Sequence, residues 1–219
     1  ENGKAKVENT KKYENLIVHI VKITEGLLKK GDNVNLCIDV ERRNSLRIHH
    51  SATHLLHEAL RRHLGDHISQ KGSLVSPDKL RFDISHNKPI SHSDLNIIEI
   101  EINNKIRENF IIKTTVMNIQ KARKIGALAL FGEKYGEEVR VVKMGENDDQ
   151  HYSVELCGGT HVNRSGDIGV FKILSESALG SGVRRIEAVA GQAALAEYQA
   201  ENKIINELAS ELKTSKEPL

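Results

Sequence analysis

The stretch RRNSLRIHHSATHLLHEALRRHL, residues 42–64, organises the chain. Its leucines and alanines recur near every 3.6 residues, which predicts an amphipathic helix that ends at Gly65. His50 and His54 are four residues apart in this helix, so both side chains should project from one face. The spacing favours two metal ligands one turn apart, and the alternative is two ordinary helix histidines.

A second pair of metal-binding residue types lies about a hundred residues downstream, in the stretch CGGTH. Cys157 and His161 are also separated by three residues, two of them glycines. The glycines disfavour a helix and predict a turn that can fold around an ion. One thiolate and three imidazoles are a plausible tetrahedral set for zinc. The alternative is that Cys157 and His161 only line a turn.

Two familiar classes of zinc protein fit this pattern poorly. A zinc protease of the HExxH type needs glutamate directly after the first histidine, where this chain has Ser51. A structural zinc finger usually takes its ligands from short spans, whereas these two pairs lie far apart. A site between a helix and sheet loops suits hydrolysis, in which zinc holds a substrate group or activates water.

The composition predicts a sizeable apolar core and a surface that carries charges of both signs. The chain has 219 residues, 4% aromatic residues and no Trp, so its core should consist mostly of Ile, Leu and Val. A net charge of +2 with 28% charged residues limits any RNA contact to a local patch.

Cys37 is interpreted as an ordinary small side chain. Without a secretory signal or long apolar run, we expect a cytoplasmic protein, without membrane or DNA partners.

The remaining elements follow from apolar periodicity and turn residues. Strands 17–23 and 34–40 should form a hairpin of a partial β-barrel, because the chain begins without Met and resembles a piece of a longer protein. A surface turn is expected over 145–150. The other predicted strands are 79–85, 114–119, 138–144, 151–156, 169–175 and 184–190, and the other predicted helices are 93–110, 120–130 and the residues from 191 onward.

This order predicts an α+β fold, with a mostly antiparallel sheet packed with helices. The partial barrel precedes it, and the amphipathic C-terminal helix that follows could begin a coiled coil. The predicted division is a partial β-barrel over 1–41, a central domain over 42–191 and a helical linker over 192–219. The basic residues Lys121, Arg123 and Lys124 would form either a solvated helix face or an RNA-facing patch.

Residues 46–190 closely resemble the editing domain of bacterial alanyl-tRNA synthetases. The related second additional domain of threonyl-tRNA synthetases shares the two metal-ligand pairs, but the longer motifs here are alanyl in character. The motifs that carry the resemblance are HHSATHLLH at 49–57, SQKGSLV at 69–75, LRFDISH at 80–86, ALFGEKYGEEVRVVKMG at 129–145, ELCGGTHV at 155–162, GDIGVFKILSES at 166–177 and GVRRIEAVAG at 182–191.

The resemblance implies an aminoacyl-tRNA deacylase that removes Ser or Gly from mischarged tRNA(Ala). It makes His50, His54, Cys157 and His161 the ligands of one zinc ion per chain. It also places Gln70 and Cys157 in the catalytic pocket, where Gln70 helps to set specificity. The longer parent would ligate alanine to tRNA(Ala) with ATP, through a core that we expect to be absent from this stretch.

Several alternatives stay open at this point. Zinc could take part in the chemistry or only sort substrates, and the rival function is a non-catalytic, zinc-stabilised tRNA-binding module. A dimer could form through parts of the parent beyond residue 219. The candidate RNA contacts are Arg42, Arg43, Arg47, Arg184 and Arg185.

Overall fold

The computed structural model divides the chain into two compact units, unit 1 (Glu1–Ile38) and unit 2 (Asp39–Leu219). Unit 1 contains a β-hairpin, and unit 2 contains two sheets with helices packed against them. The residues that the structure describes are 3–14, 16–129, 135–145 and 151–213.

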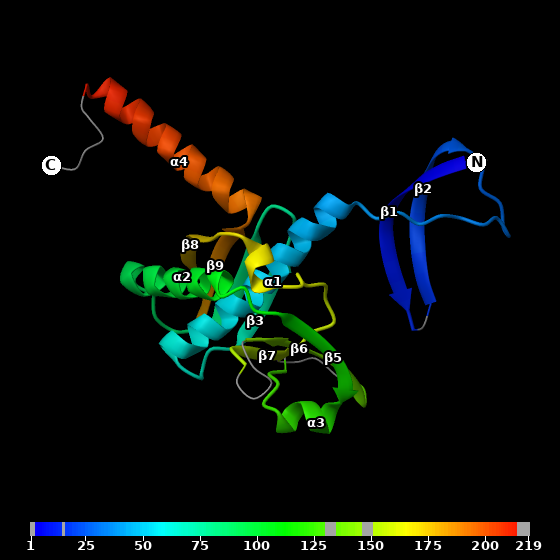
Figure 1. Cartoon of the computed structure of the whole chain (residues 1–219), viewed down its shortest axis with the longest axis horizontal. Coiled ribbons are helices and arrows are strands. Elements are labelled where there is room, and N and C mark those ends of the chain that lie inside the picture. Colours follow the sequence, from blue (N-terminus) through cyan, green and yellow to red (C-terminus); the bar gives the residue numbers. More distant parts are fainter. Residues whose placement is uncertain (1–2, 15, 130–134, 146–150, 214–219) are drawn as a thin grey trace. The chain divides into compact units, whose positions relative to one another are not determined.

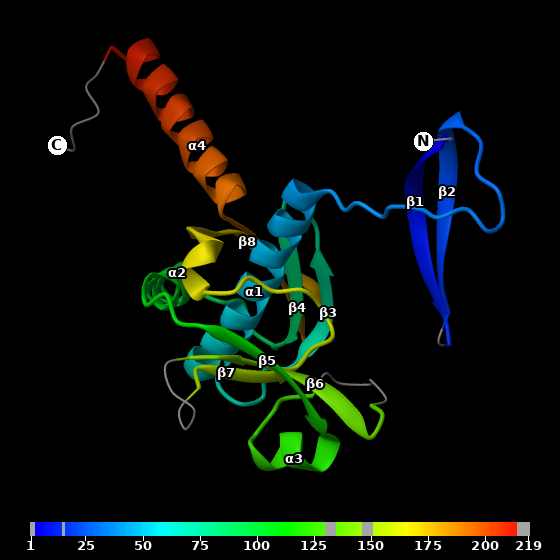
Figure 2. The ribbon, with the colours of Figure 1, turned by 45° about the vertical axis from the view of Figure 1, so that its right-hand side comes forward.

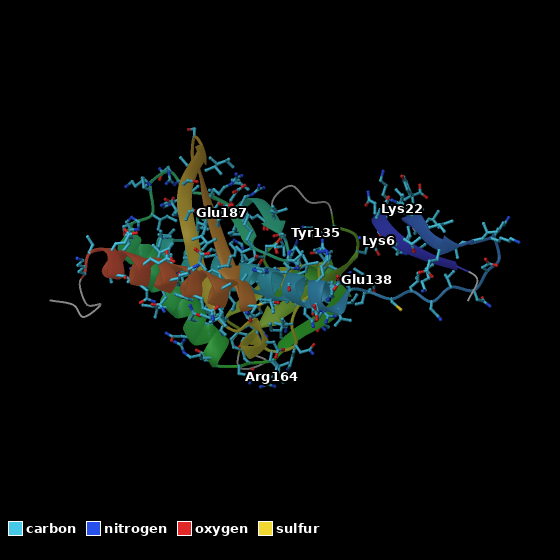
Figure 3. All side chains as sticks on the ribbon, turned by 90° about the horizontal axis from the view of Figure 1, so that it is seen from above. Lys6, Lys22, Tyr135, Glu138, Arg164 and Glu187 are labelled. Carbon is cyan, nitrogen blue, oxygen red and sulfur yellow. The ribbon has the colours of Figure 1, made fainter. Side chains whose placement is uncertain are left out.

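Unit 1 is an antiparallel hairpin of β1 (Gly3–Tyr13) and β2 (Leu16–Gly26). Nearly all of its side chains are exposed, so the two strands are held mainly by their backbone ladder. Lys6 and Lys22 are direct cross-strand partners, a like-charged pair visible in Figure 3. The described part of unit 1 contains this two-stranded sheet and no closed barrel.

The predicted strand over 34–40 is wrong. The β2 strand pairs with β1, and residues 34–39 form no strand in the structure. Alternating side chains alone do not make a strand, because a strand also needs a partner for its backbone groups. Asp39 additionally caps a helix by accepting from the Arg42 N–H at 2.9 Å, which ends the extended segment.

The helix α1 (Val40–Leu64) is the centre of unit 2, and it confirms the predicted helix over 42–64. Gly65 ends it at φ 112°, with its N–H donating to the Arg61 carbonyl at 2.9 Å. The helix runs through the middle of unit 2 in both ribbon views and contacts strands of both sheets (Figures 1 and 2). Its fully buried apolar side chains are Ala52, Leu55, Leu56, Ala59 and Leu60.

The larger sheet of unit 2 has four antiparallel strands in the order β3-β4-β9-β8. Its inner face is apolar, with Phe82 and Ile186 fully buried as cross-strand partners. The helix α2 (His92–Arg107) packs against α1 and β8. The strands are β3 (Gln70–Val75), β4 (Leu80–Ser85), β8 (Phe171–Gly180) and β9 (Val183–Ala190).

The smaller sheet has three antiparallel strands, β5 (Ile112–Asn118), β6 (Glu138–Met144) and β7 (Ser153–Leu156). The short helix α3 (Ile119–Lys124) packs against β5 and β6. The predicted helix over 120–130 is therefore too long. Gly126 has a positive φ of 78°, and Leu128 then joins the edge of β7 by donating to the Val154 carbonyl at 2.9 Å.

Two further helical elements complete unit 2. The 3₁₀ turn η1 (Ser165–Ile168) packs against α1 and α2. The helix α4 (Gln192–Glu211) follows β9 and extends away from the sheets in Figures 1 and 2. Of its side chains only Ala194 is buried, so its apolar stripe faces outward.

The α+β fold class with antiparallel sheets and a C-terminal helix is confirmed. Strand β3 was not predicted, because its residues alternate poorly and are half-buried or exposed. The turn predicted over 145–150 lies outside the described residues after Gly145. Within the described residues, no helix is both long enough and apolar enough to cross a membrane.

Candidate metal centre

Two histidines of α1, the helix pair His50 and His54, project toward the smaller sheet's last strand and the loop after it. Their ring centroids are 5.2 Å apart, as expected for side chains one turn apart. His54 is buried and His50 is half-buried. The helix pair is therefore placed by the backbone hydrogen bonds of α1 and by the core beneath it.

The loop pair, Cys157 and His161, follows directly after β7. The Cys157 N–H donates to the Arg140 carbonyl at 3.0 Å, which extends the β6–β7 ladder to the start of the loop. The Cys157 Sγ then lies 3.4 Å from Nε2 of His50 and 3.4 Å from Nε2 of His161. The fold thus brings the two sequence-predicted pairs together across about a hundred residues.

All four predicted ligand residues offer one ligand atom each, and these atoms lie within 4.8 Å of one another. Tetrahedral zinc with bonds of about 2.0–2.3 Å places neighbouring ligand atoms about 3.3–3.6 Å apart. The two 3.4 Å separations from Cys157 Sγ already match that spacing. The donor chemistry and the geometry therefore fit a zinc ion, with small adjustments of the remaining side chains.

The electrostatics of the cluster also suit a cation. Burial opposes ionisation of the Cys157 thiol, but hydrogen bonds with His161 and His50 lower its pKa to about 3. Burial lowers the pKa of His161 to about 4, so this imidazole is neutral at pH 7. The buried Nε2 of His54 lies on the side of the ring that interacts with the Cys157 thiolate. A zinc ion would bind the ionised thiolate and, once its proton is released, this imidazole nitrogen.

Gly159 lets the loop approach the helix closely. A Cβ atom built on Gly159 would overlap the ring of His50, whereas one built on Gly158 would meet no atom within 4 Å. Neither glycine has a positive φ, so the requirement at Gly159 is for space and not for an unusual backbone conformation.

Two side chains from other elements hold the loop in place. Arg140 of β6 donates from Nη1 to the carbonyls of Gly158 at 2.9 Å and Gly159 at 2.5 Å. Ser51, fully buried between the helix pair, accepts from the Val162 N–H at 3.1 Å. The same Ser51 Oγ lies 3.2 Å from Nδ1 of His161, which orients that ring with Nε2 toward the thiolate.

Sequence reasoning missed Glu155 and His57, which lie beside the cluster. The Glu155 carboxylate is 2.8 Å from Nδ1 of His54 and 3.2 Å from Nδ1 of His57. Burial opposes protonation of His54, but Glu155 raises its pKa to about 10. Burial also opposes ionisation of Glu155, yet the two histidines hold its pKa well below its usual range. The available signal was a charged residue two positions before Cys157, on the same strand face.

Three other predicted residues, Gln70, Arg184 and Arg185, lie on strands of the larger sheet, outside the four-ligand cluster. Gln70 begins β3, is half-buried and pairs with Ile84 of β4. Two of the candidate RNA contacts are engaged within the protein. Arg184 forms an ion pair with Glu176, and Arg185 donates to Asp83 through two bonds of 2.8 and 2.9 Å.

The surface also carries a basic cavity outside the metal centre. Its volume is about 330 Å³, and none of the four ligand residues lines it. The charged residues around it are Glu108, Lys113, Lys143 and Arg164.

Comparison with known proteins shows which proteins this chain is similar to. A model of the family described as "Threonyl and Alanyl tRNA synthetase second additional domain" matches residues 139–187. Alanine–tRNA ligases match almost the whole chain. Those of Ruegeria sp. (strain TM1040) and Parvibaculum lavamentivorans are 52% and 54% identical, each over 97% of this chain. The chain is homologous to a segment of the alanine–tRNA ligases.

The match to alanine–tRNA ligases covers nearly all of this chain but only part of each ligase. The chain spans about a quarter of their length, 25% of the Ruegeria protein and 24% of the Parvibaculum protein. The family match over 139–187 runs from within β6 to within β9, includes Cys157 and His161, and leaves out the helix pair. The resemblance to alanyl-tRNA synthetases that the seven sequence motifs indicated is confirmed.

Proposed function

We propose that unit 2 is an editing domain that hydrolyses Ser-tRNA(Ala) and Gly-tRNA(Ala) at a site containing one zinc ion. The observation that carries this proposal is the convergence of His50, His54, Cys157 and His161 within 4.8 Å. Homology to alanine–tRNA ligases supplies the class of substrate, an amino acid esterified to tRNA. A tRNA partner also agrees with the family that matches the loop side of the site.

The chemistry of a second, hydrolytic site follows from the size of alanine. A synthetic pocket that accepts alanine cannot exclude the smaller glycine by size, and it discriminates weakly against serine. Removing the wrong amino acid afterwards raises specificity beyond what binding alone can supply. In this proposal Gln70 contributes to recognition of the misattached amino acid.

The hydrolysis breaks one ester bond. A water oxygen bonds to the ester carbonyl carbon, the bond from that carbon to the ribose oxygen breaks, and a water proton passes to the released ribose oxygen, which becomes a hydroxyl. Zinc bound by the four ligands would supply a fixed positive charge near the ester, moderated by the Cys157 thiolate. The ribose hydroxyls of the tRNA terminus are a further source of proton transfer within the substrate.

The loop contributes hydrogen-bond donors of its own. Arg140 holds the carbonyls of Gly158 and Gly159, and the peptide bonds that follow them are trans. Because a trans peptide directs its N–H opposite to its C=O, the N–H groups of Gly159 and Thr160 point away from Arg140. The Gly159 N–H faces Cys157 Sγ at 3.4 Å. In this proposal the Gly159 N–H stabilises the Cys157 thiolate, and the Thr160 N–H stabilises the negative charge that develops on the ester oxygen.

The same proposal includes the longer protein to which this chain would belong. The longer protein would ligate alanine to tRNA(Ala) with ATP in the cytoplasm, through segments other than this chain. The division into a barrel-derived part (1–41), an editing domain (42–191) and a linker helix (192–219) belongs to the proposal too. Dimerisation would involve parts of the longer protein beyond residue 219.

The test is deacylation of Ser-tRNA(Ala) by the zinc-loaded chain, with correctly charged Ala-tRNA(Ala) as the second substrate. We expect the wild type and a Cys37→Ala variant to release serine and to spare alanine. We expect Cys157→Ala to release serine no faster than buffer. Cys37 is exposed and lies in unit 1, so it is the matched control for loss of a thiol.

Equal rates for the wild type and Cys157→Ala would contradict the deacylase proposal. If the wild type bound zinc and Ser-tRNA(Ala) but did not accelerate hydrolysis, the rival function, a non-catalytic zinc-stabilised tRNA-binding module, would replace it.

A further inference from the structure

We propose that Glu155 is a positioning residue that fixes the tautomer of His54 and so makes His54 a metal ligand. This inference rests on the metal site of the proposed function, and it adds a residue outside the four ligands. Glu155 is only 3% exposed, and it lies on β7 directly behind the helix pair.

The carboxylate of Glu155 accepts hydrogen bonds from three side chains. Its Oε2 lies 2.8 Å from Nδ1 of His54. Its Oε1 lies 3.2 Å from Nδ1 of His57 and accepts from the Ser153 hydroxyl at 3.1 Å. An ionised carboxylate can only accept, so both imidazoles carry a proton on the nitrogen that faces it.

A proton fixed on Nδ1 leaves the other nitrogen of His54 as the donor atom for a metal. That atom, Nε2, is buried, and it lies on the side of the ring that interacts with the Cys157 thiolate. Metal-bound histidines generally donate their second N–H to a carboxylate or carbonyl, which sets the ring orientation and tautomer. The bond from His54 to Glu155 has this form.

Replacing Glu155 with glutamine would reverse the tautomer preference. Glutamine offers one acceptor oxygen, and two donors, His57 and Ser153, meet at the Oε1 position. The amide NH₂ would therefore face His54 and donate to its Nδ1. The His54 proton would then reside on Nε2, where it blocks metal binding. Since the two side chains have the same shape, the change acts on hydrogen bonding and not on packing volume.

Unit 2 offers a matched control for this substitution. Glu101 contacts Nε2 of His63 at 2.6 Å, so it is also a glutamate bonded to a histidine of α1. It accepts from the Tyr152 hydroxyl at 2.6 Å, and neither partner belongs to the four-ligand cluster. Glu101→Gln thus makes the same chemical change at a histidine that binds no metal in this proposal.

The experiment measures zinc affinity by chelator competition for the wild type, Glu155→Gln and Glu101→Gln, with folding of each checked by circular dichroism. We expect Glu155→Gln to bind zinc about 10–100-fold more weakly, and Glu101→Gln to match the wild type. Cobalt-loaded samples give a second readout. The tetrahedral visible bands of the wild type and Glu101→Gln should weaken and shift in Glu155→Gln.

Glu155→Asp covers the case in which the glutamine variant does not fold. Aspartate keeps the charge but withdraws the carboxylate from His54, so we expect an intermediate loss of affinity. Wild-type affinity and an unchanged cobalt spectrum in a folded Glu155 variant would overturn the inference and leave the proposed function intact. A folded wild type that binds no zinc would instead overturn the metal site of the proposed function, and this inference with it.

Discussion

The helix pair and the loop pair supply two ligands each, but they are held in place by different interactions. His50 and His54 are placed by a regular helix whose buried side packs into the core. Cys157 and His161 are placed by side chains from elsewhere, chiefly Arg140 on β6 and Ser51 on α1. Changes to the core should therefore affect stability, whereas changes to the loop should affect metal binding.

The same difference explains which changes are tolerated. A helix carries its backbone hydrogen bonds with it, so the spacing of its side chains survives many substitutions. A loop whose carbonyls are bonded to one arginine depends on that arginine. We therefore expect two separate classes of variant. Core variants should lower the stability of the fold, and loop variants should weaken zinc binding.

The largest effect should come from the core under the helix pair. Leu60 is fully buried, and Leu60→Ala should lower the free energy of unfolding by about 2–5 kcal/mol. Denaturant titration of the metal-free protein measures it. Zinc affinity of the folded fraction should remain at the wild-type value. Leu195 on α4 is 44% exposed, and Leu195→Ala is the control, with a change of about 0.5 kcal/mol or less.

Next in size is the close approach of the loop to His50. Gly159→Ala should weaken zinc binding about 100-fold, near 2.7 kcal/mol, because the methyl group displaces a ligand ring. Gly158→Ala should bind zinc like the wild type, since its methyl group has open space. Chelator competition with both variants measures this pair. Equal affinities would show that the loop does not pack against His50 as described.

A smaller effect should follow from loss of the loop's arginine. Arg140→Ala removes two bonds to backbone carbonyls and should weaken zinc binding about 10-fold, near 1.4 kcal/mol. Arg164 donates to the Asn109 carbonyl at 2.7 Å, so Arg164→Ala removes a comparable bond outside the centre. Isothermal titration should show the loss only for Arg140→Ala. A similar loss in both variants would assign it to general destabilisation.

The smallest effect should be a pH dependence of the metal-free protein. The raised pKa of His54, about 10, means that its pairing with Glu155 stabilises the fold fully below pH 6.5. This contribution is lost as the pH rises from 6.5 through about 10. Desolvation of both groups offsets much of the gain. Unfolding titrations across that range should show the wild type approaching Glu155→Gln in stability, and parallel curves would contradict the pairing.

The sequence predicts the helix pair more fully than the loop pair. The spacing of His50 and His54 is local, and a helix fixes what that spacing means. No local pattern shows that Cys157 reaches them, because that depends on β6 and β7 pairing across the chain. Arg140 and Ser51 were missed for the same reason. Their partners are distant in sequence, at separations that periodicity does not describe.

Strand prediction failed where a strand depends on its partner. Residues 34–40 alternate well but have no partner in the described chain, whereas the polar strand β1 pairs with β2 along nearly its whole length. The half-exposed strand β3 is likewise held by its ladder to β4. Buried strands such as β6 were predicted at their observed bounds, because core packing imposes an apolar pattern on their sequence.

The most direct test of the central claim is the X-ray absorption spectrum of the zinc-loaded chain at the zinc edge. If the helix pair and the loop pair meet at one ion, the first shell should contain three nitrogens at about 2.0–2.1 Å and one sulfur at about 2.3 Å. Cys157→Ala should lose the sulfur, and Cys37→Ala should keep it. A wild-type shell without sulfur, or one of six light atoms, would contradict the four-residue centre.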